Sequence, residues 1–362
     1  MAAALALGRR GLGKVWPNPA VGCVILDAAG RVAGRGWTQP GGRPHAETEA
    51  LARAGARARG GAAFVTLEPC SHHGKTPPCA EALIAAGVSR VVAAISDPDP
   101  RVGGRGFAML QAAGIAVETG LMARQAAYDQ AGFLSRVERG RPLVALKLAA
   151  SLDGRIAAAN GDSRWITGPE ARRIGHLLRA SHDAILVGFG TALADDPRLD
   201  CRIAGLEAAS PVRLVLDSQL RLPLASDLVR RAHAQPTWAL CVEGADTGRQ
   251  AALEAAGVTV IPTPTGSNGR VDLKAALAEL GRRGLTRVLA EGGGAVAAGL
   301  LRAGLADRIY SFQAPMALGG DGIAAIGPLG LERVADAPRF IRQTVQAADD
   351  DLVATFVRNG GS

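Results

Sequence analysis

Lysine, cysteine and aromatic residues are scarce in this chain. Only four of the 41 basic residues are lysines, and aromatic residues make up 4%, so the interleaved aromatics of a single-stranded nucleic-acid-binding surface are missing. Five cysteines, an odd number, argue against a disulfide framework and for a reduced, cytoplasmic setting. The apolar opening, residues 1–7, is too short to span a membrane, and its arginines follow it, which predicts a helix and not a signal peptide.

The length and composition of the chain fit two ordinary globular domains. The chain has 362 residues, of which 48% are hydrophobic, enough for two cores. Residues 1–141 carry 17 basic and 10 acidic residues, whereas residues 142–362 carry 24 and 23. The positive excess in the first part can attract a phosphorylated small molecule or a nucleic-acid backbone, or it can simply be a solvated surface.

Short β-rich runs alternate with helical stretches, a pattern that favours α/β layers. Charged residues mixed with Gly and Pro at 138–142 predict a boundary between domains at 1–140 and 143–362. Helices between several of the later strands indicate a mainly parallel sheet. Strands are expected at 21–27, 31–37, 63–67, 91–95, 143–148, 184–187, 212–216, 238–242, 258–261, 287–290, 308–312 and 352–357, and helices from 46, 78, 105 and 123.

One imidazole and two thiols form a candidate zinc site in the first domain. His45 lies at a helix start, Cys70 just past a buried strand, and Cys79 at the start of the next helix. Three protein ligands leave a fourth position open, as in catalytic zinc sites, where the pKa of a bound water falls to about 7. Glu47, close to the first ligand, can take the proton of that water and pass it to a departing amine. The combination of H-x-E with P-C and a later Cys is typical of zinc deaminases.

Less specific readings of these residues remain open. His72 or His73 could close a structural four-ligand site, and Glu47 could be a surface residue. Cys23, Cys201 and Cys241 are expected to be small buried hydrophobic residues. Between the two thiols lies a polar, cationic loop, residues 72–76, which is a suitable place to hold a substrate phosphate or ribose.

In the second domain, Glu291 and three glycines follow a predicted strand and precede an apolar helix. Backbone amides in such a turn can approach a phosphate closely. The turn does not match G-x-G-x-x-G, and no acidic residue sits at the spacing that a Rossmann site uses for ribose. Taken alone, it can also be a tight connection between strand and helix.

Three motifs together resemble the bifunctional deaminase/reductase family of riboflavin biosynthesis. They are P-N-P-x-V-G-C-V at 17–24, H-A-E at 45–47, and T-L-E-P-C-S-H-H-G-K-T-P-P-C at 66–79. Eight residues separate the two cysteines, where common nucleobase deaminases have two. The order of the motifs in the second domain also resembles the family's reductase half. The resemblance implies a cytidine-deaminase-like three-layer α/β domain followed by a dihydrofolate-reductase-like α/β domain.

The resemblance further implies a function and a set of site residues. Zn²⁺-dependent removal of an amino group from 2,5-diamino-6-(5-phosphoribosylamino)pyrimidin-4-one would be followed by NADPH-dependent reduction of the ribosyl group to ribityl. His45, Cys70 and Cys79 would bind the metal, with Glu47 catalytic. Cofactor binding is implied for Ala149, Trp165, Thr191, Asp195, Ser218, Gly293, Gly294 and Gly299. Substrate binding is implied for Asn18, His73, Lys75, Thr76, Ser163, Arg179, Leu199, Arg202 and Glu291.

Two other hypotheses compete with this one. A base deaminase acting on tRNA would use the same zinc chemistry, but it needs no second domain of about 220 residues. A nucleic-acid-binding module with structural zinc would need a fourth protein ligand. We therefore expect a small phosphoribosylated pyrimidine as the partner, no nucleic acid, no membrane, and a homo-oligomer.

Overall fold

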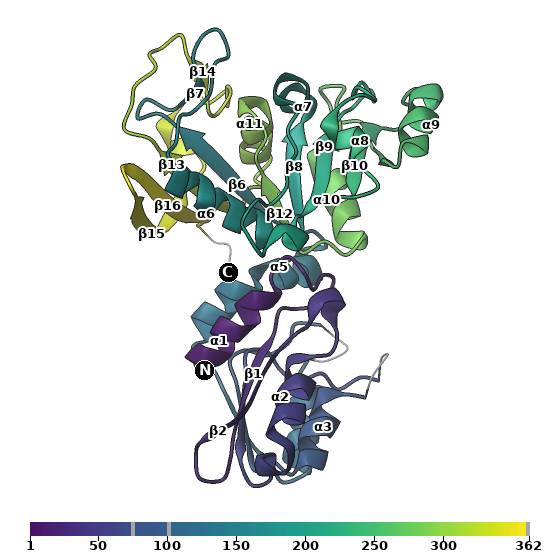
Figure 1. Cartoon of the computed structure of the whole chain (residues 1–362), viewed down its shortest axis with the longest axis vertical. Helices are drawn as coiled ribbons and strands as arrows, with labels where there is room; N and C mark the ends of the chain where they lie inside the picture. The colour runs from purple at the N-terminus through teal and green to yellow at the C-terminus, as the bar shows by residue number, and fades with distance from the viewer. Residues whose placement is uncertain (74–76, 100–102, 360–362) are drawn as a thin grey trace. The chain divides into compact units, whose positions relative to one another are not determined.

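The chain forms two compact units, Met1–Gly140 and Arg141 onward, each described by itself (Figure 1). The structure is a computed structural model, and it describes residues 1–73, 77–99 and 103–359. No helix within these ranges is long and apolar enough to cross a bilayer.

The first unit contains a five-stranded sheet of order β2-β1-β3-β4-β5. β1 pairs antiparallel with both β2 and β3, whereas β3, β4 and β5 are parallel to one another. Since β3 and β4 are parallel neighbours, the segments that follow them leave the sheet at the same edge. The strands are β1 (Gly22–Leu26), β2 (Val32–Trp37), β3 (Ala62–Val65), β4 (Arg90–Ala93) and β5 (Ala116–Thr119).

Helices cover both faces of this sheet, which makes the first unit a three-layer α/β structure as expected (Figure 1). One face carries α1 (Ala2–Gly8) and α5 (Ala123–Arg139). The other carries α2 (Ala46–Ala54), α3 (Cys79–Ala86) and α4 (Arg105–Ala112). Buried residues such as Ile25, Val65 and Leu83 join the strands and helices into one core.

The backbone of α2 packs directly onto β2 because two glycines face it. A Cβ added to Gly36 would lie 2.2 Å from the carbonyl oxygen of Ala46, and one added to Gly34 would lie 2.1 Å from that of Ala50. Real Cβ atoms do not come this close, so these positions need glycine. The contact fixes the start of α2, where His45 and Glu47 are found.

The second unit contains a nine-stranded sheet of order β11-β10-β9-β8-β12-β6-β13-β16-β15. All neighbours from β11 to β13 are parallel, and β16 and β15 add an antiparallel edge. The strands are β6 (Leu143–Ala150), β8 (Ala184–Gly188), β9 (Val212–Leu216), β10 (Thr237–Val242), β11 (Thr259–Thr263), β12 (Arg287–Ala290), β13 (Arg308–Gln313), β15 (Phe340–Ala348) and β16 (Asp351–Arg358).

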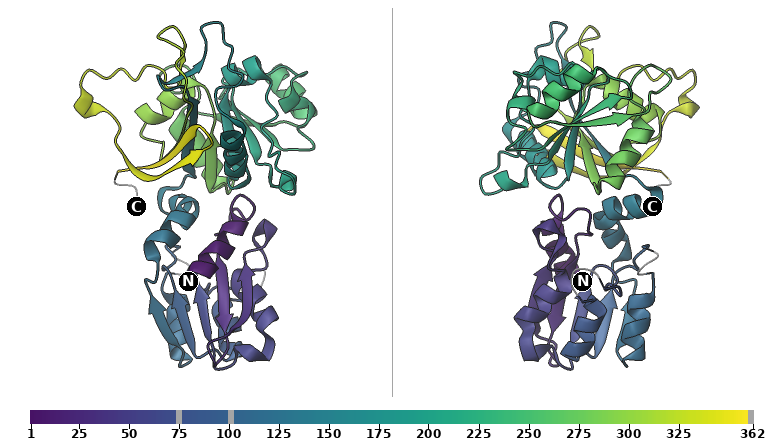
Figure 2. Two further views of the ribbon diagram at one scale, coloured as in Figure 1. Left: turned by 60° about the vertical axis from the view of Figure 1, so that its left-hand side comes forward. Right: turned by 90° about the vertical axis from the view of Figure 1, so that its right-hand side faces the viewer.

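Helices lie on both faces of this sheet (Figure 2), the arrangement that buries a parallel sheet. They are α6 (Pro169–Ala180), α7 (Phe189–Asp195), α8 (Asp227–Arg230), α9 (Thr247–Ala255), α10 (Leu273–Arg282) and α11 (Gly294–Arg302). A separate two-stranded ribbon pairs β7 (Arg155–Ala157) with β14 (Ile323–Ala324). Short 3₁₀ helices occupy Arg9–Gly11, Pro40–Gly42, Gly55–Ala58, Glu207–Ala209 and Val334–Asp336.

Candidate functional site

The three candidate metal ligands come from two helix starts and one strand exit. His45 is the N-cap residue of α2, with extended backbone (φ −72°, ψ 161°), and Cys79 is the first residue of α3. Cys70 follows β3, and its carbonyl oxygen accepts a hydrogen bond from the backbone N–H of Ala80 (3.2 Å). Two ligands therefore lie at helix starts and the third in the segment that follows a strand, as the sequence analysis expected.

The geometry of this cluster fits zinc. His45 Nδ1 lies 3.3 Å from Cys79 Sγ and 3.6 Å from Cys70 Sγ, and the ligand atoms all lie within 4.8 Å of one another. Tetrahedral ligands bound at about 2.0–2.3 Å are themselves roughly 3.5 Å apart. The donor set of one nitrogen and two sulfurs is also one that zinc prefers.

The two thiols perturb each other's protonation. A hydrogen bond from the Cys79 thiol, helped by His45, outweighs partial burial and lowers the pKa of Cys70 to about 4. The backbone N–H of Cys79, at the start of α3, also donates to Cys70 Sγ (3.3 Å). The pKa of Cys79 is raised in turn, first by that bond to Cys70 and then by burial. Both sulfurs would hold a metal as thiolates, because metal-bound thiols are deprotonated.

Glu47 lies in the first turn of α2 and is 3% exposed. Burial, followed by the negative charge of Cys70, raises the pKa of this carboxyl to about 7. Carboxyl groups of this kind serve as proton carriers near neutral pH. The sequence alternative in which Glu47 is a surface residue is therefore wrong.

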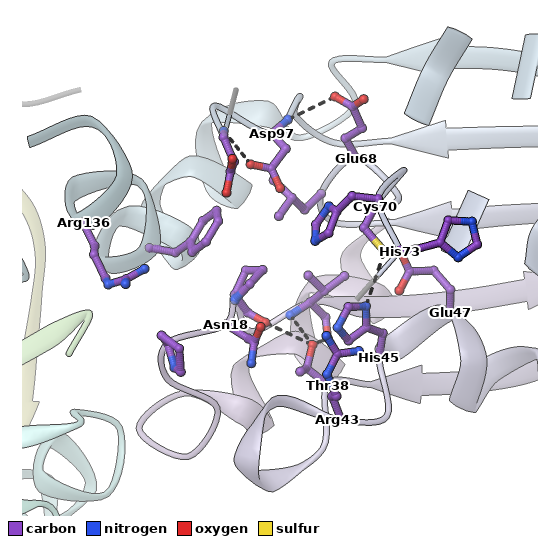
Figure 3. Close-up of a pocket in the computed structure, with 17 residues that line it drawn as sticks. Asn18, Thr38, Arg43, His45, Glu47, Glu68, Cys70, His73, Asp97 and Arg136 are labelled. Atoms are coloured by element: carbon purple, nitrogen blue, oxygen red, sulfur yellow. Dashed lines mark hydrogen bonds between the residues drawn. The ribbon is translucent and has the colours of Figure 1, made fainter. Parts of the chain in front are cut away.

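A pocket of about 580 Å³ opens beside these residues (Figure 3). This volume is within the range of small-molecule sites. The wall combines metal ligands, cations and carboxylates with a few apolar side chains. It is formed by Pro17, Asn18, Pro19, Val21, Thr38, Arg43, His45, Glu47, Leu67, Glu68, Cys70, His72, His73, Asp97, Asp99, Phe133 and Arg136.

The buried carboxylate of Glu68 ties two pocket segments together. It accepts hydrogen bonds from the backbone N–H groups of Asp97 (3.2 Å), Gly104 (3.1 Å) and Gly106 (3.0 Å). Asp97 follows β4, and burial, only partly offset by a hydrogen bond from the backbone N–H of Asp99, raises its pKa to about 6. The strand exits of β3 and β4 therefore meet in one pocket wall.

Of the four expected deaminase substrate residues, Asn18 and His73 line the pocket. Lys75 and Thr76 lie outside the described residues. The ring of His73 is largely exposed, and its Nε2 is 3.0 Å from Glu81 Oε1. His72 also lines the pocket, and its buried Nδ1 has no hydrogen-bond partner among the residues that the structure describes.

The sequence analysis did not identify Arg43, Asp97, Asp99 or Arg136 as pocket residues. For the two aspartates a signal existed, because residues 97–100 read D-P-D-P directly after a predicted strand. Polar residues at the carboxyl end of a parallel strand are common binding residues. Nothing in the local sequence singles out Arg136, whose position depends on how α5 packs across the sheet.

In the second unit, a buried ion-pair network lies at the carboxyl end of β12. Arg179 on α6 donates Nε and Nη2 to the two carboxylate oxygens of Glu291 (2.9 and 3.0 Å), and Lys147 Nζ lies 3.6 Å from Oε2. Burial raises the pKa of Glu291, but the charges of Arg179 and Lys147 outweigh it and lower the value to about 2. The two expected substrate residues Arg179 and Glu291 are thus in direct contact.

The glycine-rich turn between β12 and α11 contacts α7. The backbone N–H of Gly293 donates to Thr191 Oγ1 (3.0 Å), which joins two residues expected to bind the cofactor. A Cβ on Gly294 would lie 2.7 Å from the carbonyl oxygen of Ala324, so this glycine also has a packing role. A Cβ on Gly190 would meet nothing within 4 Å.

The remaining expected residues have varied surroundings. The ring of Trp165 is 66% exposed, and the guanidinium of Arg172 lies 4.5 Å from its centroid. Ser218 Oγ accepts a hydrogen bond from the backbone N–H of Val271 (3.1 Å). Gly299 lies in the middle of α11, where a Cβ would approach Leu273 to 3.1 Å. Ala149 is in β6, Asp195 ends α7, and Ser163, Leu199 and Arg202 lie in the connections that flank α6 and α7.

Comparison with known proteins identifies the family of both units. Residues 1–95 match the model of the cytidine and deoxycytidylate deaminase zinc-binding region. Residues 142–354 match the model of the RibD C-terminal domain. The riboflavin biosynthesis protein RibD of Escherichia coli is 43% identical over 99% of this chain and 98% of its own length. The same protein of Bacillus amyloliquefaciens is 38% identical over 100% and 96%.

The chain belongs to the RibD family. It is a bifunctional deaminase and reductase of riboflavin biosynthesis with a His/Cys/Cys zinc site. The structure of RibD from Acinetobacter baumannii has a TM-score of 0.88 to this chain, with 37% identity over 99% of this chain and 98% of that one. A Thermotoga maritima structure has a TM-score of 0.86, with 32% identity over 99% and 97%. The latter is described as a diaminohydroxyphosphoribosylaminopyrimidine deaminase/5-amino-6-(5-phosphoribosylamino)uracil reductase.

Membership of the RibD family confirms the expected family, enzyme class and two-part α/β fold. A tRNA base deaminase does not account for the match over residues 142–354, and a purely structural zinc module does not account for two catalytic activities. The buried positions of Cys23, Cys201 and Cys241 confirm that these cysteines are small core residues.

Proposed function

We propose that the deaminase half acts on 2,5-diamino-6-(5-phosphoribosylamino)pyrimidin-4-one. The product, 5-amino-6-(5-phosphoribosylamino)uracil, would then be reduced to the ribityl compound with NADPH by the reductase half. The observation that carries the proposal is the convergence of His45, Cys70 and Cys79 beside the buried Glu47, in a pocket large enough for a pyrimidine nucleotide. The description of the Thermotoga maritima relative supports the same two substrates.

In the deaminase pocket, His45, Cys70 and Cys79 would hold one zinc ion per chain. Zinc bound there acts as a Lewis acid and makes water a nucleophile at neutral pH. Glu47 accepts the proton of the attacking water and delivers it to the departing amino group, a role that its buried carboxyl suits. Asn18 and His73 would contact the nucleotide, and Lys75 and Thr76 stay predictions for the same role.

In the reductase half, NADPH supplies the hydride. The hydroxyl of Thr191 and the turn at Gly293 and Gly294 would hold the cofactor phosphates, and Trp165 offers a flat apolar face to a cofactor ring. Ala149, Asp195, Ser218 and Gly299 complete the proposed cofactor set.

The same half would hold the substrate through a second group of residues. Arg179 and Arg202 supply guanidinium groups suited to bidentate phosphate binding, and Glu291 holds Arg179 in place. Ser163 and Leu199 complete this proposed substrate set.

We further propose that the protein is a cytoplasmic homo-oligomer that binds neither nucleic acid nor membrane. The small, odd number of cysteines supports the cytoplasmic setting, and the scarcity of aromatic residues supports the absence of nucleic-acid binding.

A coupled assay with purified protein tests both halves. Ammonia and NADPH are measured separately after addition of the diamino ribotide. We expect ammonia release without NADPH, and NADPH oxidation only after deamination. Ammonia release from tRNA but not from the ribotide would contradict the proposed substrate, and NADPH oxidation before any ammonia release would contradict the proposed order.

A further inference from the structure

A cluster of three arginines surrounds Asp200 beside the Glu291 network. The carboxylate of Asp200 accepts one bond from Arg202 Nη1 (2.9 Å), and its other oxygen lies 3.0 Å from Arg198 Nη2. The backbone carbonyl of Asp200 accepts a hydrogen bond from Arg179 Nη1 (3.0 Å). One acidic residue therefore holds three guanidinium groups that come from α6 and from the segment after α7.

The backbone and a neighbouring histidine fix this arrangement. Leu199, between Arg198 and Asp200, has a left-handed φ of 54° and is 4% exposed, so a buried side chain anchors a sharp turn. His176 Nδ1 accepts a hydrogen bond from the backbone N–H of Arg202 (3.3 Å). Burial, together with the charges of Arg179 and Arg202, lowers the pKa of His176, which keeps it a neutral acceptor.

The charges of this cluster do not cancel. The two carboxylates of Asp200 and Glu291 are paired with four cationic side chains, those of Lys147, Arg179, Arg198 and Arg202. Four positive and two negative charges leave a net charge of +2. Such an excess matches a phosphate monoester, which carries nearly two negative charges at neutral pH.

The outer two arginines also have room for a ligand. The side chains of Arg198 and Arg202 are 46% and 52% exposed, so solvent or a ligand can reach their remaining donors. Asp227, the further carboxylate near Arg198, is already paired with Arg230 (2.6 Å) and Arg231 (3.7 Å). Arg198 and Arg202, which Asp200 holds in place, thus form a preorganised anion-binding site at the edge of the reductase site.

We propose that Arg198 is an additional phosphate-binding residue of the reductase, and that Asp200 is the positioning residue that presents Arg198 and Arg202 as a pair. The inference rests on the proposed function, since it assigns the phosphate of the ribotide to this cluster. It predicts that the reductase distinguishes a phosphorylated substrate from its riboside partly through Arg198.

Steady-state NADPH oxidation by the full chain tests the proposal, with 5-amino-6-(5-phosphoribosylamino)uracil and the dephosphorylated riboside as paired substrates. For Arg198→Gln we expect KM for the ribotide to rise about three- to ten-fold with kcat unchanged, a size typical of a half-exposed charge pair. KM for the riboside, or its inhibition constant where turnover is slow, should stay within about two-fold. Arg198→Lys should restore part of the ribotide affinity.

Arg282→Gln is the matched control. Arg282 is 70% exposed and lies 2.6 Å from Glu279, and its replacement should change neither constant. A ribotide KM within two-fold of wild type in Arg198→Gln would overturn the inference, and so would an equal rise for both substrates, which would indicate a structural role. Failure of the proposed function looks different, because the wild-type protein would then not reduce the ribotide at all.

Discussion

Replacement of Glu291 by Gln should remove a large, pH-dependent part of the stability of the second unit. The carboxylate has two cationic partners and its side chain is 9% exposed. A pKa lowered from 4.5 to about 2 corresponds to about 3 kcal/mol. Removal of one partner of a buried ion pair costs a similar amount, about 3–5 kcal/mol. At pH 7 we therefore expect Glu291→Gln to lower the free energy of unfolding by about 3 kcal/mol.

The sign of the pH dependence follows from the direction of the shift. The folded state holds this carboxyl ionised more strongly than the unfolded state does, so the stabilisation is present above about pH 4.5. It is lost as the pH falls from 4.5 toward 2. The difference between wild type and Glu291→Gln should accordingly shrink over that interval, because a Gln side chain does not titrate.

Urea unfolding between pH 7 and pH 3 measures this difference. A background with Trp16→Phe and Trp37→Phe leaves Trp165 and Trp238 as fluorescent reporters of the second unit. Glu170→Gln is the matched control in the same unit, since Glu170 forms an exposed bidentate pair with Arg173 at 2.6–2.7 Å, and such pairs contribute little. Equal acid sensitivity of wild type and Glu291→Gln would refute the reasoning, as would equal effects of Glu170→Gln and Glu291→Gln at pH 7.

Three further outcomes are expected. Glu47→Gln should lower kcat for ammonia release by about 10²–10⁴-fold and leave zinc content and NADPH oxidation with the deaminated ribotide unchanged; undiminished ammonia release would exclude the proton-carrier role. Cys70→Ser should lose zinc, measured by mass spectrometry, together with deamination, while reduction of the deaminated ribotide continues; full zinc occupancy would contradict the ligand assignment. Gly36→Ala should weaken zinc binding, because the new Cβ would lie 2.2 Å from the carbonyl oxygen of Ala46 and displace the start of α2; unchanged zinc affinity would show that the contact can relax.

The parts of the fold that bury a hydrophobic face could be predicted from the sequence. β8 (A-I-L-V-G) and the Val-Leu-Ala end of β12 are apolar runs that are buried along almost their whole length, so periodicity and length were sufficient. β5 and β15 were missed because both are edge strands with mostly exposed residues. The other two edge strands, β2 and β11, bury part of their residues and were expected. A strand that is exposed along most of its length lacks the hydrophobic pattern, and its existence depends on the partner that pairs with it.

The residues of the candidate sites also fall into two groups, those that could be identified from the sequence and those that could not. The metal ligands could be identified because their spacing within short motifs carries the chemistry. The pocket residues Arg43 and Arg136, and the contact between Arg198 and Asp200, could not, since they depend on how distant segments pack. Arg179 and Arg202 were expected only through the family resemblance. Only Asp97 and Asp99 had a usable signal, as polar residues that closely follow a predicted parallel strand.

Glu47 and Glu291 are both buried, but their pKa values are shifted in opposite directions. The cause of each shift indicates the role of the residue. Glu47 lies among thiols with no cationic side chain strong enough to offset burial, so its pKa is raised to about 7. Glu291 is also buried, but Arg179 and Lys147 outweigh the burial and lower its pKa to about 2. A carboxyl whose pKa lies near the working pH can exchange a proton, whereas one that stays ionised can only hold cations in place. Glu47 would thus serve the metal site that His45, Cys70 and Cys79 form, whereas Glu291 holds Arg179 and Lys147.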